Sequence, residues 1–343
     1  MHKNIFKNKA SAADDASELI THYSLPVTGA QPPSLINYLL LFGAGFIWGS
    51  QYILNKFALV SFSTTTIAAG RIGIGALLLT LLLATRIEPL PVSKTPSSFW
   101  KSLPDFILIG LLEATLPCVL VAWAQLRLAS SITAVLIGTV PLFATVLEAL
   151  FVPGSRIGLK KAGGIFLGFV GVFVLVAPSF NDASLPSTAG TSLVFPILAV
   201  LASALFFAIA MLLIKIRLGN RFGPIRSAQG ILTGAAITTI PLMLWVTKPW
   251  TIVAFHPALS AVIALIALGI FCGGLVYTLF VLLINRAGPS FASTCNYLVP
   301  PIGAFLGIIF SGEKWTSSLC YSLVLILFSL WLSSGKKKIE AKG

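Results

Sequence analysis

The sequence predicts an all-α integral membrane protein with ten transmembrane helices in two inverted five-helix repeats. Three observations predict it: a very apolar composition, ten apolar segments of membrane-spanning length, and a match of the sequence to itself at one fixed offset. Of the 343 residues, 57% are hydrophobic and only 10% are charged, and the mean hydropathy is +0.96. These values exceed what a soluble core of this size needs, so lipid is the expected solvent.

The ten apolar segments follow from the thickness of a bilayer. A spanning helix needs about 20 mostly apolar residues, because a hydrocarbon layer of about 30 Å is crossed at about 1.5 Å per residue. The longest connection, 85–104, leaves no room for a soluble catalytic domain. The spans are expected at residues 36–55, 66–84, 105–126, 132–152, 160–177, 193–214, 227–246, 258–284, 291–310 and 317–334.

The segments outside the spans carry few signals of their own. Residues 1–35 are polar and lack an apolar run, so we expect a disordered cytoplasmic tail and neither a signal nor a transit peptide. Residues 335–343 are expected to form a basic cytoplasmic tail. The four cysteines fall inside apolar spans without a CxxC pair, and the three histidines are scattered. No metal and no cofactor are therefore expected.

The formal charge of +13 is explained by topology. Most Lys and Arg residues fall in connections that share one side if the N-terminus is cytoplasmic. The exceptions are Lys56, Arg127, Lys248 and Lys314 on the other side, and Arg71 within a span. The positive-inside rule then predicts that both termini are cytoplasmic. Nucleic-acid binding is not expected, because it would require basic residues gathered on one surface with stacking aromatics, and most aromatics here lie in spans.

An internal repeat appears at an offset of 159 residues, where Lys56 meets Lys215 and Pro141 meets Pro300. The two units are expected at 36–177 and 193–334, with five helices each. Because five is odd, the second unit enters the membrane from the opposite side. Inverted repeats are typical of secondary transporters, whose substrate site lies between the halves near the midplane. Duplicated helices can also build any bundle, and channels use repeats too.

Short motifs in both halves add a family resemblance. Their order and spacing over about residues 36–334 resemble the EamA-type drug/metabolite transporter superfamily. The resemblance implies ten helices in two inverted units that move metabolites, amino acids or drugs, often outward. The first half departs from the pattern at Pro153-Gly154, where the family often carries Gly-Glu. The motifs are Phe46-Ile47-Trp48-Gly49-Ser50, Ala68-Ala69-Gly70-Arg71, Asn285-Arg286-Ala287-Gly288-Pro289-Ser290, Pro300 and Gly312-Glu313.

Ionisable side chains inside a bilayer are costly, so each one is a functional candidate. Glu113 lies near the expected bilayer centre, and we predict that it binds substrate and is a candidate for proton coupling. Two alternatives stay open for it, namely a structural pair with Arg71 and a hydrogen-bonded neutral acid. Arg71 and Glu148 lie closer to the ends of their spans and can snorkel to an interface, so both are interpreted as structural charges.

Aromatic, amide and proline residues complete the predicted site. Packing or an interfacial belt is the alternative role for each aromatic residue. Prolines free backbone carbonyls, and paired helix breaks in the two halves point to a transporter site. The further substrate-binding candidates are Trp48, Gln51, Tyr52, Trp123, Tyr277, Asn296 and Tyr297. The helix breaks expected near the site are at Pro117, Pro141, Pro300 and Pro301.

Together these patterns predict a secondary transporter of small organic metabolites or drugs, an exporter or exchanger that works by alternating access, and not an enzyme. Its expected partners are a small-molecule substrate and the lipid bilayer of the cell membrane. Glycine pairs such as Gly45/Gly49 indicate close helix packing or a homodimer. Two other classes stay open: a membrane-embedded enzyme acting on lipid-linked substrates, which needs catalytic groups gathered at one face, and a channel.

Overall fold

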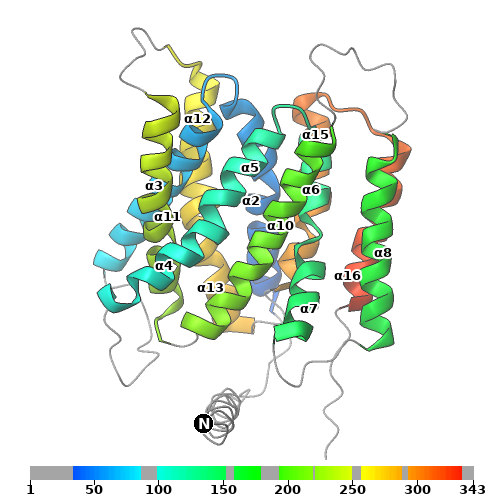
Figure 1. Ribbon diagram of the computed structural model, residues 1–343, viewed down its shortest axis with the longest axis horizontal. Helices are drawn as coiled ribbons and strands as arrows, with labels where there is room; N and C mark the ends of the chain where they lie inside the picture. The colour runs from blue at the N-terminus through cyan, green and yellow to red at the C-terminus, as the bar shows by residue number, and fades with distance from the viewer. Residues whose placement is uncertain are drawn as a thin grey trace, which may run out of the picture.

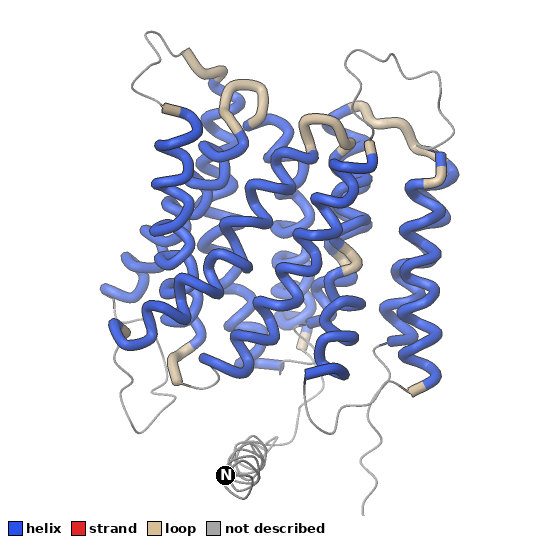
Figure 2. The backbone as a smooth tube through the Cα atoms, in the orientation of Figure 1, coloured by secondary structure: helices blue, strands red, loops and turns tan. Residues whose placement is uncertain are grey.

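The computed structural model describes residues 34–85, 99–151, 158–178, 193–218, 221–248, 256–287 and 293–333. These residues form a bundle of helices and contain no β-strand (Figures 1 and 2). Large apolar side chains cover its outside; Leu77, Phe166 and Phe173 are 60%, 69% and 66% exposed. Such a surface suits lipid, where helices satisfy their own backbone groups. The expected tails 1–35 and 335–343 lie outside the described residues, apart from residues 34 and 35.

Eight helical runs within the described ranges are long and apolar enough to cross a membrane. They correspond to eight of the ten expected spans. The helices that make up these runs are α3 (Thr64–Ala84), α4 (Leu103–Gly110), α5 (Leu116–Ala124), α6 (Ser130–Ile137), α7 (Val140–Phe151), α8 (Leu159–Val176), α10 (Val194–Leu213), α11 (Pro224–Thr247), α12 (Leu259–Ala267), α13 (Val276–Ala287) and α15 (Val299–Ser311).

The first and last expected spans are helical but differ from the other eight. Helix α2 (Leu35–Ala58) has 24 residues, but polar side chains such as Asn37, Gln51 and Asn55 lower its hydropathy. Asn37 and Asn55 are buried and so face the bundle. Helix α16 (Ser317–Ser333) has 17 residues, slightly fewer than a full span needs. That all ten segments cross the membrane therefore stays a prediction.

The described residues contain three π-helical segments; Ile214–Leu218 (η3) lies at the end of α10, and the other two lie within expected spans. The turn Leu111–Thr115 (η2) joins α4 to α5, and the segment Leu268–Leu275 (η5) joins α12 to α13. At the offset of 159, Glu113 in η2 corresponds to Cys272 in η5, so the two segments occupy equivalent places in the sequence. A π-helical turn holds an extra residue and occurs frequently at functional sites.

Helix α2 contacts α15, α13, α12 and α6 along one face, while the opposite face of its first half, which includes Leu39 and Phe42, is exposed. Helix α3 packs along α11, and α8 packs along α16. Glycines allow several of these close approaches. A Cβ on Gly49 would lie 2.8 Å from Ile302 Cβ, and one on Gly110 would lie 2.5 Å from both Ala235 N and Ile231 O. The structure thus uses these glycines for packing within one chain.

Candidate functional site

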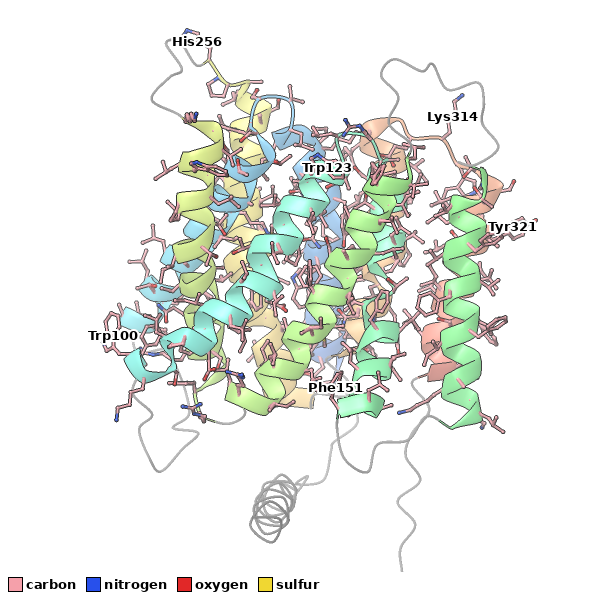
Figure 3. The ribbon with its side chains drawn as sticks, viewed as in Figure 1. Trp100, Trp123, Phe151, His256, Lys314 and Tyr321 are labelled. Carbon is pink, nitrogen blue, oxygen red and sulfur yellow. The ribbon has the colours of Figure 1, made fainter. Side chains whose placement is uncertain are left out.

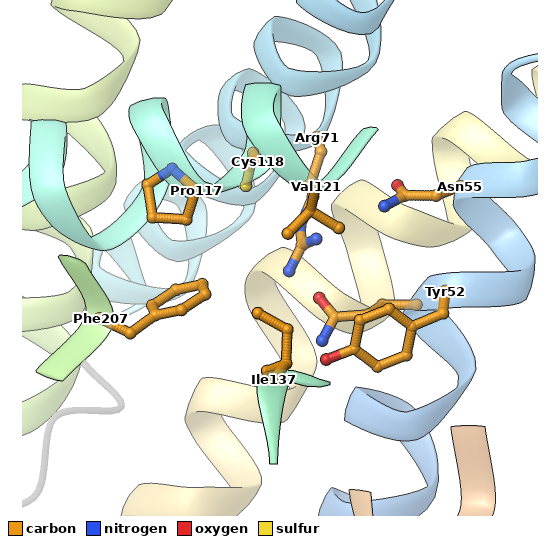
Figure 4. A pocket seen from close by; sticks show the side chains of 9 residues that line it. Tyr52, Asn55, Arg71, Pro117, Cys118, Val121, Ile137 and Phe207 are labelled. Carbon is orange, nitrogen blue, oxygen red and sulfur yellow. The ribbon is translucent and has the colours of Figure 1, made fainter. Parts of the chain in front are cut away.

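A small cavity lies in the interior of the bundle, between α2, α3, α5, α6 and α10 (Figure 4). Its volume of about 20 Å³ leaves room for roughly one water molecule. The lining combines one cation, amide and hydroxyl groups, a thiol and apolar side chains. The lining residues are Gln51, Tyr52, Asn55, Arg71, Pro117, Cys118, Val121, Ile137 and Phe207.

Arg71 is the only charged residue of that lining. Its guanidinium extends past Val121 into the space between Phe207 on one side and Tyr52 on the other (Figure 4). From the sequence alone, Arg71 is interpreted as a structural charge able to snorkel to an interface. The structure directs its side chain into the cavity instead. This direction follows from α3, which packs against both α5 and α11 and so turns this face inward.

A hydrogen-bond network adjoins the cavity at the α5–α6 connection. The Gln125 side-chain nitrogen donates to the Tyr52 carbonyl at 2.8 Å and to Ser130 Oγ at 3.3 Å. Its oxygen accepts a hydrogen bond from Asn55 Nδ2 at 3.0 Å. Because Asn55 and Gln125 are both buried, these bonds satisfy polar groups that would otherwise destabilise the bundle. The network joins the last turns of α2 and α5 to the start of α6.

Glu313, just after α15, lies beside this network and caps α6. Its carboxylate accepts hydrogen bonds from Ser130 N at 2.6 Å and from Ser131 N at 2.9 Å. Lys56 Nζ lies 3.5 Å from Glu313 Oε1. Burial alone would raise the pKa of this carboxyl, but the hydrogen bonds from Ser131 and Ser130 and the charge of Lys56 hold its pKa below the ordinary value. Glu313 is therefore ionised at neutral pH.

An aromatic cluster joins α2 to α13 near the cavity. The ring centroids of Trp48 and Tyr277 are 6.2 Å apart in an edge-to-face arrangement, and those of Trp48 and Phe280 are 5.2 Å apart. Tyr277 lies within electrostatic range of both Arg71 and Glu113. The cluster thus places two predicted binding residues, Trp48 and Tyr277, next to the charged groups of the bundle interior.

Glu113 lies in the π-helical turn η2 and does not line the cavity. Its Oε2 atom is buried and has no hydrogen-bond partner among the residues described. No ion pair joins it to Arg71 in that part of the chain. The structural Arg71–Glu113 pair, left open by the sequence, is therefore not formed in this conformation. Binding and proton coupling by Glu113 remain predictions.

The remaining sequence candidates lie farther from the cavity. Tyr297 Oη donates to the Leu330 carbonyl of α16 at 3.2 Å, and Asn296 lies in the same 3₁₀ turn, Ser293–Tyr297. Trp123 lies near one end of the bundle, with Arg127 Cζ 5.5 Å from its ring centroid (Figure 3). Glu148 lies in the last turn of α7.

Three of the four predicted helix-breaking prolines lie in the first turn of a helix, and the fourth, Pro117, lies inside a continuous helical run. Pro117 lies in α5 just after η2, and it also lines the cavity. Pro141 is the second residue of α7. Pro300 and Pro301 lie in the first turn of α15, after a 3₁₀ turn. A proline in a first turn costs no backbone hydrogen bond, which explains how α7 and α15 tolerate theirs. Pro117 instead follows helical residues, and the π-helical turn before it is the kind of local adjustment that accommodates a proline within a span.

Five lining residues were not among the sequence candidates: Asn55, Cys118, Val121, Ile137 and Phe207. Asn55 follows Gln51 by four residues, so helical spacing could have placed it on the same face. Cys118 is one of the four cysteines that the sequence places inside apolar spans. Phe207 is one of 24 phenylalanines, and no feature of the sequence distinguishes it.

An apolar helical bundle around a polar interior defines a multi-pass membrane protein. Sequence comparison gives the family. Residues 35–177 and 194–335 each match the EamA-like transporter family, and the chain belongs to that family. The match confirms the resemblance drawn from the short motifs.

Similar proteins are also named as transporters. The transporter YvbV of Bacillus subtilis is 26% identical over 90% of this chain and 95% of its own length. The inner membrane transporter YedA of Escherichia coli K12 is 27% identical over 89% and 94%. A protein of Chlamydia trachomatis serovar L2, named S-adenosylmethionine/S-adenosylhomocysteine transporter, is 24% identical over 83% and 84%. All three relatives are named as transporters, and none is named as an enzyme.

A solved crystal structure has the same fold. It superposes with a TM-score of 0.58 at 17% identity and covers 87% of this chain and 96% of the other. At this identity the likeness concerns the fold alone.

Proposed function

We propose that this chain is a secondary transporter that moves a small organic solute across the cell membrane by alternating access. The observation that carries the proposal is the cavity around Arg71, a partly polar space within an otherwise apolar bundle. Helix α10, which contributes Phe207, belongs to the second matched segment, and the other lining helices belong to the first. A site enclosed by both segments suits a carrier whose halves move against each other.

The inverted ten-helix repeat is part of this proposal. It is supported by the π-helical segments η2 and η5, which occupy equivalent places at the 159-residue offset. It is also supported by the pairing of α3 with α11 and of α8 with α16, because each pair consists of counterparts at that offset. Elements next to a pseudo-two-fold axis pack against their own counterparts, so such pairings are expected of the arrangement.

The proposed topology places both termini in the cytoplasm. His256, Trp123 and Lys314 lie at one end of the bundle, and Trp100 and Phe151 lie at the other (Figure 3). The positive-inside rule assigns the first end to the outside. The Gln125 network and Glu313 then lie on the outer side of the cavity. The expected direction, export or exchange, rests on the family resemblance.

Transport by purified protein in liposomes tests the proposal. S-adenosylmethionine and S-adenosylhomocysteine, the substrates in the name of the Chlamydia relative, are the first solutes to try. We expect saturable uptake that unlabelled solute on the opposite side accelerates. Flux that never saturates would favour a channel, and turnover of a lipid-linked substrate would favour an enzyme. If neither these solutes nor a wider set of metabolites showed saturable transport, the proposal would be contradicted.

A matched pair of variants tests the site. Cys118→Trp fills the cavity, whereas Leu77→Trp places the same ring on an exposed, lipid-facing position. We expect Cys118→Trp to abolish transport and Leu77→Trp to retain it. Equal transport by both variants would show that solute passes elsewhere.

Proton coupling through Glu113 has its own test. Glu113→Gln keeps the size of the side chain and removes its titration, so the variant should lose the pH dependence of transport. An unchanged pH profile would remove Glu113 from the coupling mechanism and leave the transporter proposal intact.

A further inference from the structure

Arg71 carries a permanent charge in the interior of the bundle. A guanidinium stays protonated in proteins, so burial cannot neutralise it. Arg71 is residue eight of the 21-residue helix α3, and its side chain lines the cavity. A cation at this depth is costly unless a countercharge or several hydrogen bonds compensate for it.

The described part of the chain does not supply that countercharge. No carboxylate there lies within ion-pair distance of Arg71, and no hydrogen bond of its guanidinium is found within those ranges. Its electrostatic neighbours are Cys118, Cys272, Tyr277 and Tyr52, which are thiols and phenols that are ordinarily neutral at pH 7. Glu313, which is ionised, is already held by Ser130, Ser131 and Lys56.

The rest of the cavity lining is suited to an organic molecule. Pro117, Val121, Ile137 and Phe207 present apolar surface, whereas Gln51 and Tyr52 present groups that can donate and accept hydrogen bonds. Figure 4 shows the Arg71 guanidinium between the apolar side formed by Phe207 and Pro117 and the polar side formed by Tyr52 and Asn55. Such a lining complements a molecule with an apolar body and an anionic group.

We propose that the transported solute carries a carboxylate and that Arg71 binds it. The planar guanidinium fork matches a carboxylate in two parallel hydrogen bonds, which lysine cannot reproduce. The inference rests on the proposed transport function and specifies its substrate class. Since the cavity has room for about one water molecule in this conformation, the lining helices must separate to admit the solute.

Pairs of compounds that differ by their carboxylate test the inference. L-phenylalanine is compared with phenethylamine, and S-adenosylhomocysteine with its decarboxylated analogue, by thermal stabilisation of the purified full chain and by competition for transport. In wild type, the carboxylate member of at least one pair should bind about 10- to 100-fold more tightly, the range expected for hydrogen bonds between charged groups.

Variants then assign the preference to Arg71. Arg71→Gln should reduce binding of the carboxylate member to the level of its partner, and Arg71→Lys should restore it only in part. Arg217→Gln is the matched control, because Arg217 is half-exposed and pairs with Asp105. This control should keep the wild-type preference. A preference that survives in Arg71→Gln would overturn the inference.

The wild-type comparison decides the question even if Arg71→Gln does not fold. Equal binding within every pair, no binding by any carboxylate compound, or equal stabilisation by chloride alone would each overturn the carboxylate site. Saturable transport of a solute without a carboxylate would overturn this inference while supporting the transporter. Carboxylate binding at Arg71 without transport of any solute would instead contradict the proposed function.

Discussion

The Glu313 cap is expected to stabilise one end of the bundle measurably. Glu313→Gln keeps the size of the side chain, but one of its two acceptor oxygens becomes an NH₂ group that faces a backbone N–H. The Glu313 side chain is only 8% exposed, so water screens it little. A hydrogen bond to a charged group contributes about 1.5–3 kcal/mol. We therefore expect a loss of about 2 kcal/mol, which corresponds to a Tm lower by roughly 4 °C.

The stabilisation by Glu313 should depend on pH, and the direction of its pKa shift says how. Because the pKa of Glu313 is lower in the folded chain than in the unfolded chain, its ionisation stabilises the fold above the unfolded pKa of about 4.3. That contribution is lost as the pH falls through the lower, folded pKa. The difference in Tm between wild type and Glu313→Gln should therefore be largest near pH 7 and shrink below about pH 4.

Thermal unfolding of the purified chain in detergent, recorded from pH 3 to pH 8, measures both effects. Lys56→Gln is the control: its Nζ belongs to a side chain that is 36% exposed, so losing the ion pair should cost less than about 1 kcal/mol. The reasoning is refuted if Glu313→Gln unfolds at the wild-type temperature at pH 7, or if the difference persists unchanged in acid.

Three further substitutions follow from the packing and the polar networks, each measured by thermal unfolding in detergent. Gly110→Ala should destabilise by about 1–3 kcal/mol, because its Cβ would meet α11 backbone at 2.5 Å; Gly73→Ala, with no atom within 4 Å, should be neutral or mildly stabilising. Gln125→Leu should cost about 2–4 kcal/mol, because it leaves the buried Asn55 amide without its acceptor. Thr115→Val should cost about 1–2 kcal/mol, because the Thr115 hydroxyl lies 2.7 Å from Thr239 Oγ1 and the valine removes it. Thr115→Ser keeps the hydroxyl, so an equal loss of Tm in that variant would contradict the explanation.

Much of the helical layout could be predicted from hydropathy. Eight expected spans correspond to apolar helices of sufficient length, because a run of about 20 apolar residues has few alternatives to a spanning helix. The first span is less apolar than the other expected spans, since its amides Asn37 and Asn55 lower its hydropathy yet are buried against other helices. The π-helical segments were not predicted, because one extra residue in a turn leaves no signature in an apolar sequence.

The cavity was only partly predictable. Gln51 and Tyr52 were identified from residue type, and both line it. Arg71 was identified as a charge within a span, but the direction of its side chain depends on which neighbours α3 meets, and no single-helix pattern contains that information. Likewise, the partnership of Glu313 with the start of α6 joins residues more than 180 positions apart.

The π-helical turn Leu111–Thr115 has a consequence for the angular phase of α5. One added residue rotates everything beyond it by about 100° relative to an uninterrupted α-helix. Pro117, Cys118 and Val121 point into the cavity only with that rotation in place. If the turn tightened to regular α-helix, all three side chains would rotate away from the cavity together. A change in the hydrogen-bond register of one turn would therefore be enough to change which residues line the cavity.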